Sequence, residues 1–225
     1  MFDLNQENLD EIFNDEFCGA LYYNFDTATK AYQQHKTENR SFFSYDAGNA
    51  LSSRILTYSI QKNILQNAFT PNSVYFARNG KLNKHGLNGL YIEYRNFILT
   101  IGKTMRPLRL LEAAKYKRVL SKYNSGIEPS QLCLKLPEGD RHYDPDYRYA
   151  QVTYGYSHER SEPHHMTLIV PSPDYSSHLY HRNLMEYKNL EKGLALYSDK
   201  EQEEQVVFLK KDITKFIQTG DGKNA

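Results

Sequence analysis

The feature that most constrains the fold is a pair of strand-like segments joined by a short polar loop, in the stretch 147–171. Within YRYAQVTYGYS, two sets of residues alternate with the period of a β-strand, Tyr147, Tyr149, Gln151 and Thr153 against Arg148, Ala150, Val152 and Tyr154. The loop HERSEP follows, and then HHMTLIVP, an apolar run closed by Pro171. This pattern predicts a β-hairpin with a loop of about six residues.

Helical patterns occupy other parts of the chain. Apolar residues recur at helical spacing from Leu4 to Leu21, and a second apolar stripe from Asp46 to about Phe69 ends before Pro71. A third helix is predicted from Pro107 to Tyr123, with proline at its start and Gly126 after its end. A fourth is predicted to begin at Asp174 or Ser176 and to end near Gly193, and the tail predicts a last short helix or strand.

The strand signals and the helices together predict the fold class. Residues 73–79 and 131–137 read as strands, and 89–103 as two short strands around Arg95–Asn96 or one strand with a bulge. The order of elements predicts an α+β fold, a mainly antiparallel sheet flanked by helices in a single domain. We expect an N-terminal helical region at 1–70, an α+β core at 71–198 and a C-terminal helix or tail at 199–225.

Composition indicates a folded protein of the cytoplasm. Hydrophobic residues make up 40% and charged residues 24%, and no run of 18 apolar residues is present to span a membrane. The acidic, amphipathic start fits neither a secretory signal nor a transit peptide. Cys18 and Cys133 lie far apart and show no metal-ligand spacing, which favours a reducing, cytoplasmic setting.

Charge is balanced overall and concentrated locally. The net charge is +1, so no global electrostatic case for nucleic acid exists, but residues 103–122 carry seven bases against Glu112 alone. Such a helix would bind phosphates, with tyrosines stacking on bases, or dock on an acidic partner protein; it would equally serve as a solvated face. The candidate binding residues are Arg106, Arg109, Lys115, Lys117, Arg118, Lys122, Tyr116 and Tyr123.

The hairpin loop is rich in metal-ligating side chains. His158, Glu162 and His164 are candidate ligands for zinc or non-haem iron, since imidazole and carboxylate suit both metals. Adjacent His164 and His165 are expected on opposite faces of a strand, so only one would serve a given site. No HExxH or facial-triad spacing is present, and an exposed polar loop explains the same residues.

Two enzyme hypotheses use histidines and carboxylates elsewhere. His35-Lys-Thr37 and His165-Met-Thr167 resemble the paired His-x-Thr strands of two-histidine phosphoesterases, in which one imidazole is the base and the other the acid. A metal nuclease would use the loop 138–146, with Asp144 and Asp146, and a downstream element. That element would be Glu186-x-Lys188, on a predicted helix, or Glu93-x-Arg95, which lacks lysine. The candidate catalytic residues are His142, Asp144, Asp146 and His165.

Motifs of nucleotide-dependent enzymes are absent from the sequence. It contains no Walker loop, no G-x-G-x-x-G, no G-x-S-x-G and no C-x-x-C pair. We therefore expect no organic cofactor, and a divalent metal only if the nuclease or phosphoesterase hypothesis holds.

Two segments together resemble a group of uncharacterised bacterial proteins. The basic IGKTMRPLRLLEAAKYKR and the later VTYGYSHERSEPHHMTLIVPSPDYSSHLYHRNL resemble proteins of mobile elements that are encoded beside helix-turn-helix regulators. The corresponding features here are Leu108-Arg109, Gly155-Tyr156, Leu168–Pro171 and Leu179–Leu184, with Tyr180 or His181 in place of an expected tryptophan. The resemblance implies a toxin–antitoxin or phage-defence role, and it supplies no catalytic residue.

The sequence therefore favours a cytoplasmic, macromolecule-binding protein of a mobile-element or phage-conflict system. Its partner would be nucleic acid or an acidic protein, no membrane is involved, and a homodimer is compatible with these features. The alternative is a metal-dependent nuclease or phosphoesterase that uses the His- and Asp-rich region 142–165. A third hypothesis, a structural phage component, predicts a large homo-oligomer.

Overall fold

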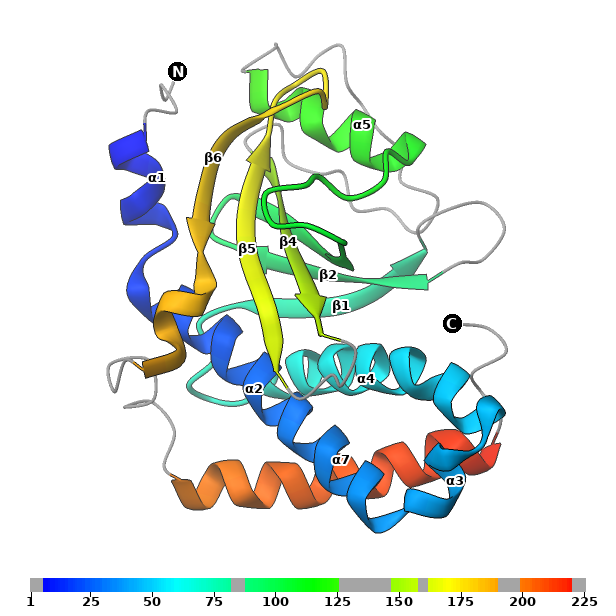
Figure 1. Ribbon diagram of the computed structural model, residues 1–225. Coiled ribbons are helices and arrows are strands. Elements are labelled where there is room, and N and C mark those ends of the chain that lie inside the picture. Colours follow the sequence, from blue (N-terminus) through cyan, green and yellow to red (C-terminus); the bar gives the residue numbers. More distant parts are fainter. Residues whose placement is uncertain (1–5, 82–87, 126–146, 158–161, 190–198, 220–225) are drawn as a thin grey trace. The chain divides into compact units, whose positions relative to one another are not determined.

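The fold is built on a six-stranded sheet whose strands follow the order of the chain, β1-β2-β3-β4-β5-β6 (Figure 1). The structure is a computed structural model, and it describes residues 6–81, 88–125, 147–157, 162–189 and 199–219. The chain divides into two compact units. The sheet unit takes residues 1–14, 74–155 and 164–186, and the helical unit takes 15–73, 156–163 and 187–225.

The strands are β1 (Phe76–Lys81), β2 (Asn88–Tyr94), β3 (Phe97–Lys103), β4 (Arg148–Tyr156), β5 (Pro163–Pro171) and β6 (His178–Asn183). The pairs β1–β2, β2–β3 and β5–β6 are antiparallel, whereas β3 and β4 are parallel. The predicted hairpin is formed by β4 and β5, neighbours whose arrows run in opposite directions in Figure 1. The predicted pair of strands around Arg95–Asn96 is confirmed, and Arg95 has the left-handed φ of 49° that the tight turn requires.

The edge strand β6 is covered by a short helix, α1 (Gln6–Ile12), which lies beside it in Figure 1. Fully buried Phe13 follows α1 and packs on Phe97 and Tyr180, with ring centroids 4.7 and 5.9 Å away. The Tyr180 hydroxyl donates to Asp10 Oδ1 at 2.6 Å. The prediction of one continuous helix from Leu4 to Leu21 is therefore wrong, because Phe13 packs against the sheet between α1 and the next helix.

The basic segment also differs from its prediction. Only α5 (Lys115–Ser121) is α-helical, and a 3₁₀ turn, η1 (Lys122–Ser125), follows it. Residues 104–114, here called the strap, have neither helical nor strand structure, and Leu108 has a φ of 59°. The Thr104 amide donates to the Tyr154 carbonyl at 2.8 Å, which extends the β3–β4 pairing by one bond. Tertiary contacts thus outweigh the helical periodicity that begins at Pro107.

The helix predicted from Asp174 or Ser176 is also wrong, because this stretch forms a turn, then β6, then the 3₁₀ turn η3 (Leu184–Asn189). Ser172 and Asp174 satisfy backbone groups of the turn: the Ser172 amide donates to the Ser177 carbonyl at 2.9 Å, and Asp174 Oδ1 accepts the Ser176 amide at 3.2 Å. Hydrogen bonds from Ser172 and Ser176 lower the pKa of exposed Asp174 to about 2. The residues that read as a helix cap are therefore turn residues.

The helical unit contains α2 (Asp15–Glu38), α3 (Arg40–Ser44), α4 (Asp46–Asn67) and α7 (Asp199–Thr219). The predicted helix from Asp46 corresponds to α4, and the tail forms α7, a helix of 21 residues. A buried amide network joins these helices. Asn63 Nδ2 donates to the Asn24 carbonyl at 2.9 Å, Asn67 Nδ2 donates to Asn24 Oδ1, and Gln205 Nε2 donates to Asn67 Oδ1 at 3.1 Å.

The predicted fold class, α+β with a mainly antiparallel sheet, is confirmed. The domain boundaries at 70 and 198 stay a prediction. Among the described residues, no helix is both long enough and apolar enough to cross a membrane. Cys18 is a free thiol buried in α2, whereas Cys133 and the strand predicted at 131–137 lie outside the described residues.

One buried side chain holds α5 and η1 to the sheet. Asn124 Oδ1 accepts the Tyr149 amide at 2.9 Å, while its Nδ2 donates to the carbonyls of Tyr149 and Pro171 at 3.0 and 2.7 Å. Asn124 thus bonds to backbone groups at the start of β4 and at the end of β5, as the backbone of a neighbouring strand would. All three backbone groups depend on this one amide for these hydrogen bonds.

We expect Asn124→Ala to lower the free energy of unfolding by about 2–3 kcal/mol, since it leaves buried polar groups without partners. The measurement is urea unfolding followed by circular dichroism. Asn183→Ala, which removes only an exposed bond to the Met185 amide, is the control. Equal stability of the two variants would contradict this role of Asn124.

Candidate functional site

The sheet presents an unusually polar face beneath the strap. Thr100 and Gln151 are register partners in β3 and β4, as are Gly102 and Thr153, so all four lie on one face. Thr100, Gln151 and Thr153 are buried, and on β5 the backbone carbonyl of Thr167 accepts a hydrogen bond from Thr153 Oγ1 at 3.4 Å. A covered sheet face is ordinarily apolar, so this one is a candidate site.

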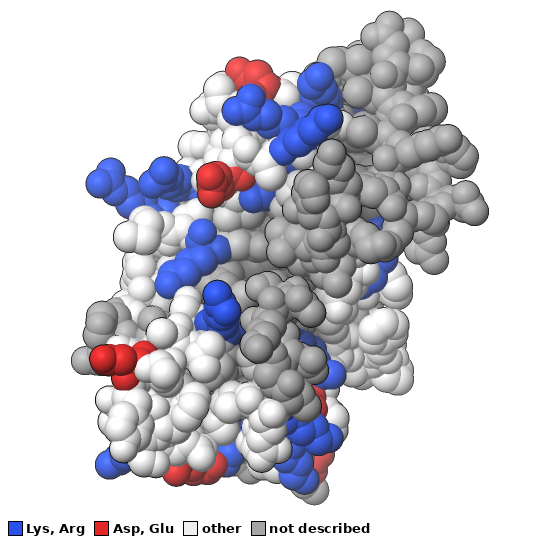
Figure 2. All heavy atoms as spheres, turned by 90° about the vertical axis from the view of Figure 1, so that its right-hand side faces the viewer, with Lys and Arg blue, Asp and Glu red and all other residues white. Residues whose placement is uncertain are grey.

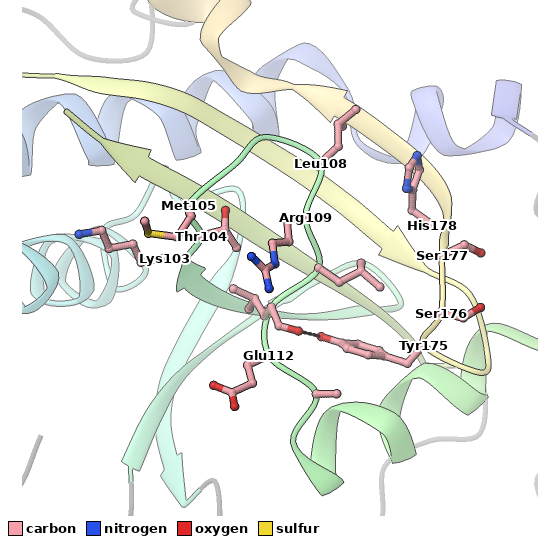
Figure 3. Close-up of a pocket in the computed structure, with 13 residues that line it drawn as sticks. Lys103, Thr104, Met105, Leu108, Arg109, Glu112, Tyr175, Ser176, Ser177 and His178 are labelled. Carbon is pink, nitrogen blue, oxygen red and sulfur yellow. Dashed lines mark hydrogen bonds between the residues drawn. The ribbon is translucent and has the colours of Figure 1, made fainter.

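Leu111 is the main contact between the strap and this face. A Cβ on Gly102 would lie 2.6 Å from Leu111 Cδ2, so the leucine packs directly on the glycine and a larger residue would force its side chain to shift. The Leu111 amide donates to Gln151 Oε1 at 3.4 Å, and the Tyr175 hydroxyl lies 3.0 Å from the Leu111 carbonyl (Figure 3). Burial raises the pKa of Tyr175, so this hydroxyl keeps its proton.

A groove of about 680 Å³ lies between the strap and the turn after β5 (Figure 3). We call it the strap groove. Its lining comes from the end of β3, the strap and residues 175–178: Lys103, Thr104, Met105, Leu108, Arg109, Leu110, Leu111, Glu112, Ala113, Tyr175, Ser176, Ser177 and His178. Arg109, an exposed residue of the strap, lies near the middle of this view. The volume is in the range of ligand-binding clefts.

The bases around the strap groove are largely uncompensated. In the described ranges, no carboxylate pairs with the exposed residues Lys103, Arg106, Arg109, Lys115 and Arg118. At the height of α5, Lys and Arg side chains protrude from the face shown in Figure 2, with isolated carboxylates among them. Lys122 is exposed on η1. A local positive surface therefore exists on a chain of net charge +1.

Lys117 differs from the other bases. It is half-buried, and desolvation lowers its pKa, against the opposing charge of Glu112. Its Nζ donates to the Glu112 carbonyl at 3.0 Å and lies 5.7 Å from the Tyr116 ring centroid. Lys117 is thus committed to contacts within the chain.

The two candidate tyrosines also face inward. Tyr123 is 8% exposed in a cluster with Leu120, Tyr149 and Tyr175, and Tyr116 packs against that cluster. Burial raises the pKa of Tyr116 to about 12. Tyr123 is buried and Tyr116 is partly buried, so both rings pack on the chain's own residues.

Two exposed aliphatic side chains were missed by the sequence analysis. Met105 is 79% exposed and Leu108 is 42% exposed, and both line the strap groove. The sequence analysis placed Leu108 within the helix expected from Pro107 to Tyr123, and it singled out neither side chain as exposed. Exposed apolar residues beside uncompensated bases are typical of a binding surface.

His164 and His165 do not separate as expected for adjacent strand residues. Their ring centroids are 4.5 Å apart in an edge-on contact, although His164 is exposed and His165 is 5% exposed. Gly155 makes the arrangement possible, since a Cβ there would lie 2.3 Å from His165 Cε1 and 2.8 Å from His164 Cε1.

His165 fastens the start of the strap. Its Nε2 lies 3.0 Å from Thr104 Oγ1, which in turn donates to the Arg106 carbonyl at 3.2 Å. Both bonds form at once only if Nε2 carries the proton and donates to Thr104. Burial, followed by the charge of His164, lowers the pKa of His165, which keeps the ring neutral. Because Nε2 donates to Thr104 rather than accepting its proton, His165 has a structural role here and does not activate Thr104 as a base.

The metal candidates are not brought together among the residues described. His142, Asp144, Asp146 and His158 lie outside the described residues. Glu162, in the helical unit, forms an ion pair with Lys188 at 2.5 Å, and Glu93 pairs with Arg78 at 2.7 Å. Glu186 lies on η3 rather than on a strand. No cluster of three or more His, Cys, Asp or Glu suited to a metal occurs within those ranges. The metal-enzyme hypothesis stays a prediction.

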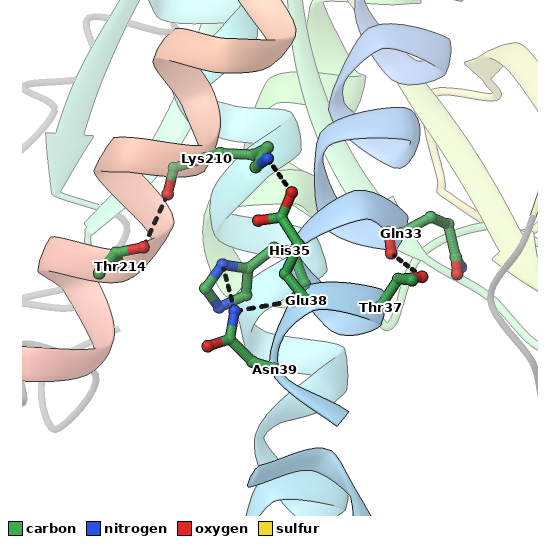
Figure 4. Close-up of polar contacts among 7 residues, drawn as sticks. All are labelled: Gln33, His35, Thr37, Glu38, Asn39, Lys210 and Thr214. Carbon is green, nitrogen blue, oxygen red and sulfur yellow. Dashed lines mark hydrogen bonds and ion pairs between the residues drawn. The ribbon is translucent and has the colours of Figure 1, made fainter. Parts of the chain in front are cut away.

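The two-histidine phosphoesterase hypothesis is wrong, because His35 and Thr37 lie on helix α2 (Figure 4). The His35 ring meets Phe43 edge-on at 5.9 Å, and its Nδ1 lies 3.4 Å from Asn39 Nδ2. Burial is the main cause that lowers the pKa of His35. Thr37 donates to the Gln33 carbonyl at 2.9 Å, as a helical threonine commonly does.

Comparisons with protein-family models, curated proteins and solved structures gave no match for this chain. The function is therefore argued from the site itself.

We expect His165 to make stability depend on pH. Because its pKa in the folded chain lies below the ordinary 6.5, its contribution is complete above pH 6.5 and is lost as the pH falls towards the folded pKa. His35 acts in the same direction, so the measurement compares unfolding free energies of wild type and His165→Gln from pH 8 to pH 5. The difference should shrink below pH 6.5; a difference that does not change with pH would exclude a depressed pKa at His165.

Proposed function

We propose that this chain binds an acidic protein partner through the strap and α5. The observation that carries the proposal is a group of five exposed bases without carboxylate partners in the described chain, Lys103, Arg106, Arg109, Lys115 and Arg118. Complementary charge accelerates encounter and selects partners, and the strap groove gives the partner a concave place to bind.

The aliphatic side chains favour a protein over nucleic acid. Met105 and Leu108 provide the apolar contact that the core of a protein interface requires. Proteins that bind single strands instead use aromatic rings for stacking, whereas Tyr116 and Tyr123 pack inward. The helix α5 has seven residues, which is short for reading a DNA groove.

The biological setting is proposed on the sequence resemblance alone. The similarity to proteins of mobile elements supports a role in a toxin–antitoxin or phage-conflict system, in which an acidic protein would be the partner. The widely separated cysteines and buried Cys18 support a cytoplasmic setting.

The test uses a short fluorescein-labelled peptide rich in Glu and Leu and measures its affinity by fluorescence anisotropy. We expect Arg109→Glu, Lys115→Glu and Arg118→Glu together to weaken binding by about tenfold or more, because attraction becomes repulsion. Lys117 is left intact because it bonds within the chain.

The matched control replaces Arg40, Lys211 and Lys215, exposed bases of the helical unit, by Glu and so changes the net charge equally. It should leave peptide affinity within about twofold of wild type. Equal weakening by both triple variants would mean that only net charge matters. Tighter binding of a single-stranded oligonucleotide than of the peptide would favour nucleic acid and contradict the proposal.

A further inference from the structure

Gln151, which does not itself line the strap groove but bonds to residues that do, carries an unsatisfied donor. The residue is fully buried on β4, and its Oε1 lies within hydrogen-bond reach of two groove-lining residues. The Leu111 amide lies 3.4 Å away and the Tyr175 hydroxyl 3.0 Å away. Its Nε2 has no hydrogen-bond acceptor among the described residues. A buried amide donor without an acceptor is costly, and such groups cluster at functional sites.

The orientation of the amide is fixed by its neighbours. The Leu111 backbone N–H can only donate, so the atom facing it must be the oxygen of Gln151. Exchanging oxygen and nitrogen would let the NH₂ donate to the Tyr175 oxygen, but it would set the NH₂ against the Leu111 N–H and leave the amide oxygen without a donor. The unpaired group is therefore the NH₂, which requires an acceptor.

Hydrogen bonds hold the strap over Gln151 mainly near its two ends. At its start, Thr104 bonds to β4 through its amide and to His165 and the Arg106 carbonyl through its hydroxyl. Towards α5, Leu111 bonds to Gln151 and Tyr175, the Glu112 carbonyl accepts from Lys117 Nζ, and the Ala114 carbonyl accepts from Arg118. Between residues 105 and 110, no backbone N–H donates to the sheet within the described chain, and Pro107 and Leu108 form a turn. Leu108 within this stretch has a φ of 59°, which is unfavourable for leucine. The strap can therefore shift without breaking sheet hydrogen bonds.

We propose that Gln151 is a specificity-determining residue of the strap groove, whose Nε2 donates to a carboxylate oxygen of an acidic side chain inserted from the partner. The proposal rests on the proposed function. Lys103 and Arg109 line the groove and supply the balancing charge, and the planar Arg109 guanidinium suits a carboxylate. Leu111, seated over Gly102, is displaced to admit the side chain.

The experiment replaces Gln151 by Glu, an isosteric change. The Glu carboxylate still accepts from Leu111 and Tyr175, but it lacks the NH₂ donor and repels a carboxylate. We expect Gln151→Glu to weaken binding of the labelled Glu- and Leu-rich peptide about tenfold or more. Binding of the same peptide with Gln in place of Glu should change less than about twofold.

The matched control is Thr29→Val, which removes a buried hydroxyl of α2, bonded to Tyr156 at 2.6 Å, that does not line the strap groove. It should keep wild-type affinity. Equal weakening by Thr29→Val would show that the chain is merely destabilised, and an unchanged affinity in Gln151→Glu would overturn the inference while the triple variant still tests the proposed function. A wild type that binds no peptide overturns both.

A measurement on the wild type covers the case in which Gln151→Glu does not fold. The side-chain amide protons of Gln151 are followed by ¹H–¹⁵N NMR while the peptide is added. We expect them to shift downfield as they acquire a carboxylate acceptor. A peptide that binds and shifts the strap amides but leaves these protons in place would overturn the assignment.

Discussion

The contact between Leu111 and Gly102 is the constraint on which the site depends. A Cβ on Gly102 would lie 2.6 Å from Leu111 Cδ2, so the leucine packs directly on the glycine and would have to shift for a larger residue there. With Leu111 seated there, its backbone meets Gln151 and Tyr175, and the strap and the turn after β5 enclose a groove. Residues 107–114 do not continue the helix of α5, so the bases of the strap lie along an irregular segment.

The two ends of the strap are held by different chemistry. At Thr104, neutral His165 donates to a hydroxyl that itself bonds to Arg106, and Gly155 makes room for the imidazole. At the other end, α5 and η1 are tied to β4 and β5 by the amide of Asn124. Between these ends, exposed Met105, Leu108 and Arg109 face the groove or the solvent. The strap is therefore held at both ends and has few hydrogen bonds between them. Such a segment can move to let a side chain of a partner enter the groove.

The pattern of polar and apolar residues along the chain was enough to predict the fold class. It failed to predict where several helices end or do not form. Strict alternation in β4, the apolar run of β5 and the Arg95–Asn96 turn are encoded in adjacent residues, so these elements were predicted. Phe13 and Leu111 lie where predicted helices are interrupted, and they pack on distant strands, which periodicity does not report. The Ser172–Asp174 turn is held by local bonds of a kind that a helix cap also makes, so Asp174 was read as a cap. The basic segment was recognised as a candidate binding surface from its charges. Gln151 was placed on one face of a strand, and no binding role was predicted for it. Its unpaired amide becomes visible once Leu111 and Tyr175 are placed beside it.

The central claim is that the strap groove is the surface on which this chain binds its partner. Hydrogen–deuterium exchange of the full chain, with and without the Glu- and Leu-rich peptide, tests it most directly, because strap amides that lack hydrogen bonds exchange rapidly in the free protein. The account predicts that protection increases in residues 104–114 and 172–178 and stays unchanged in α4 and α7. Protection confined to the helical unit, with the strap unaffected, would contradict it.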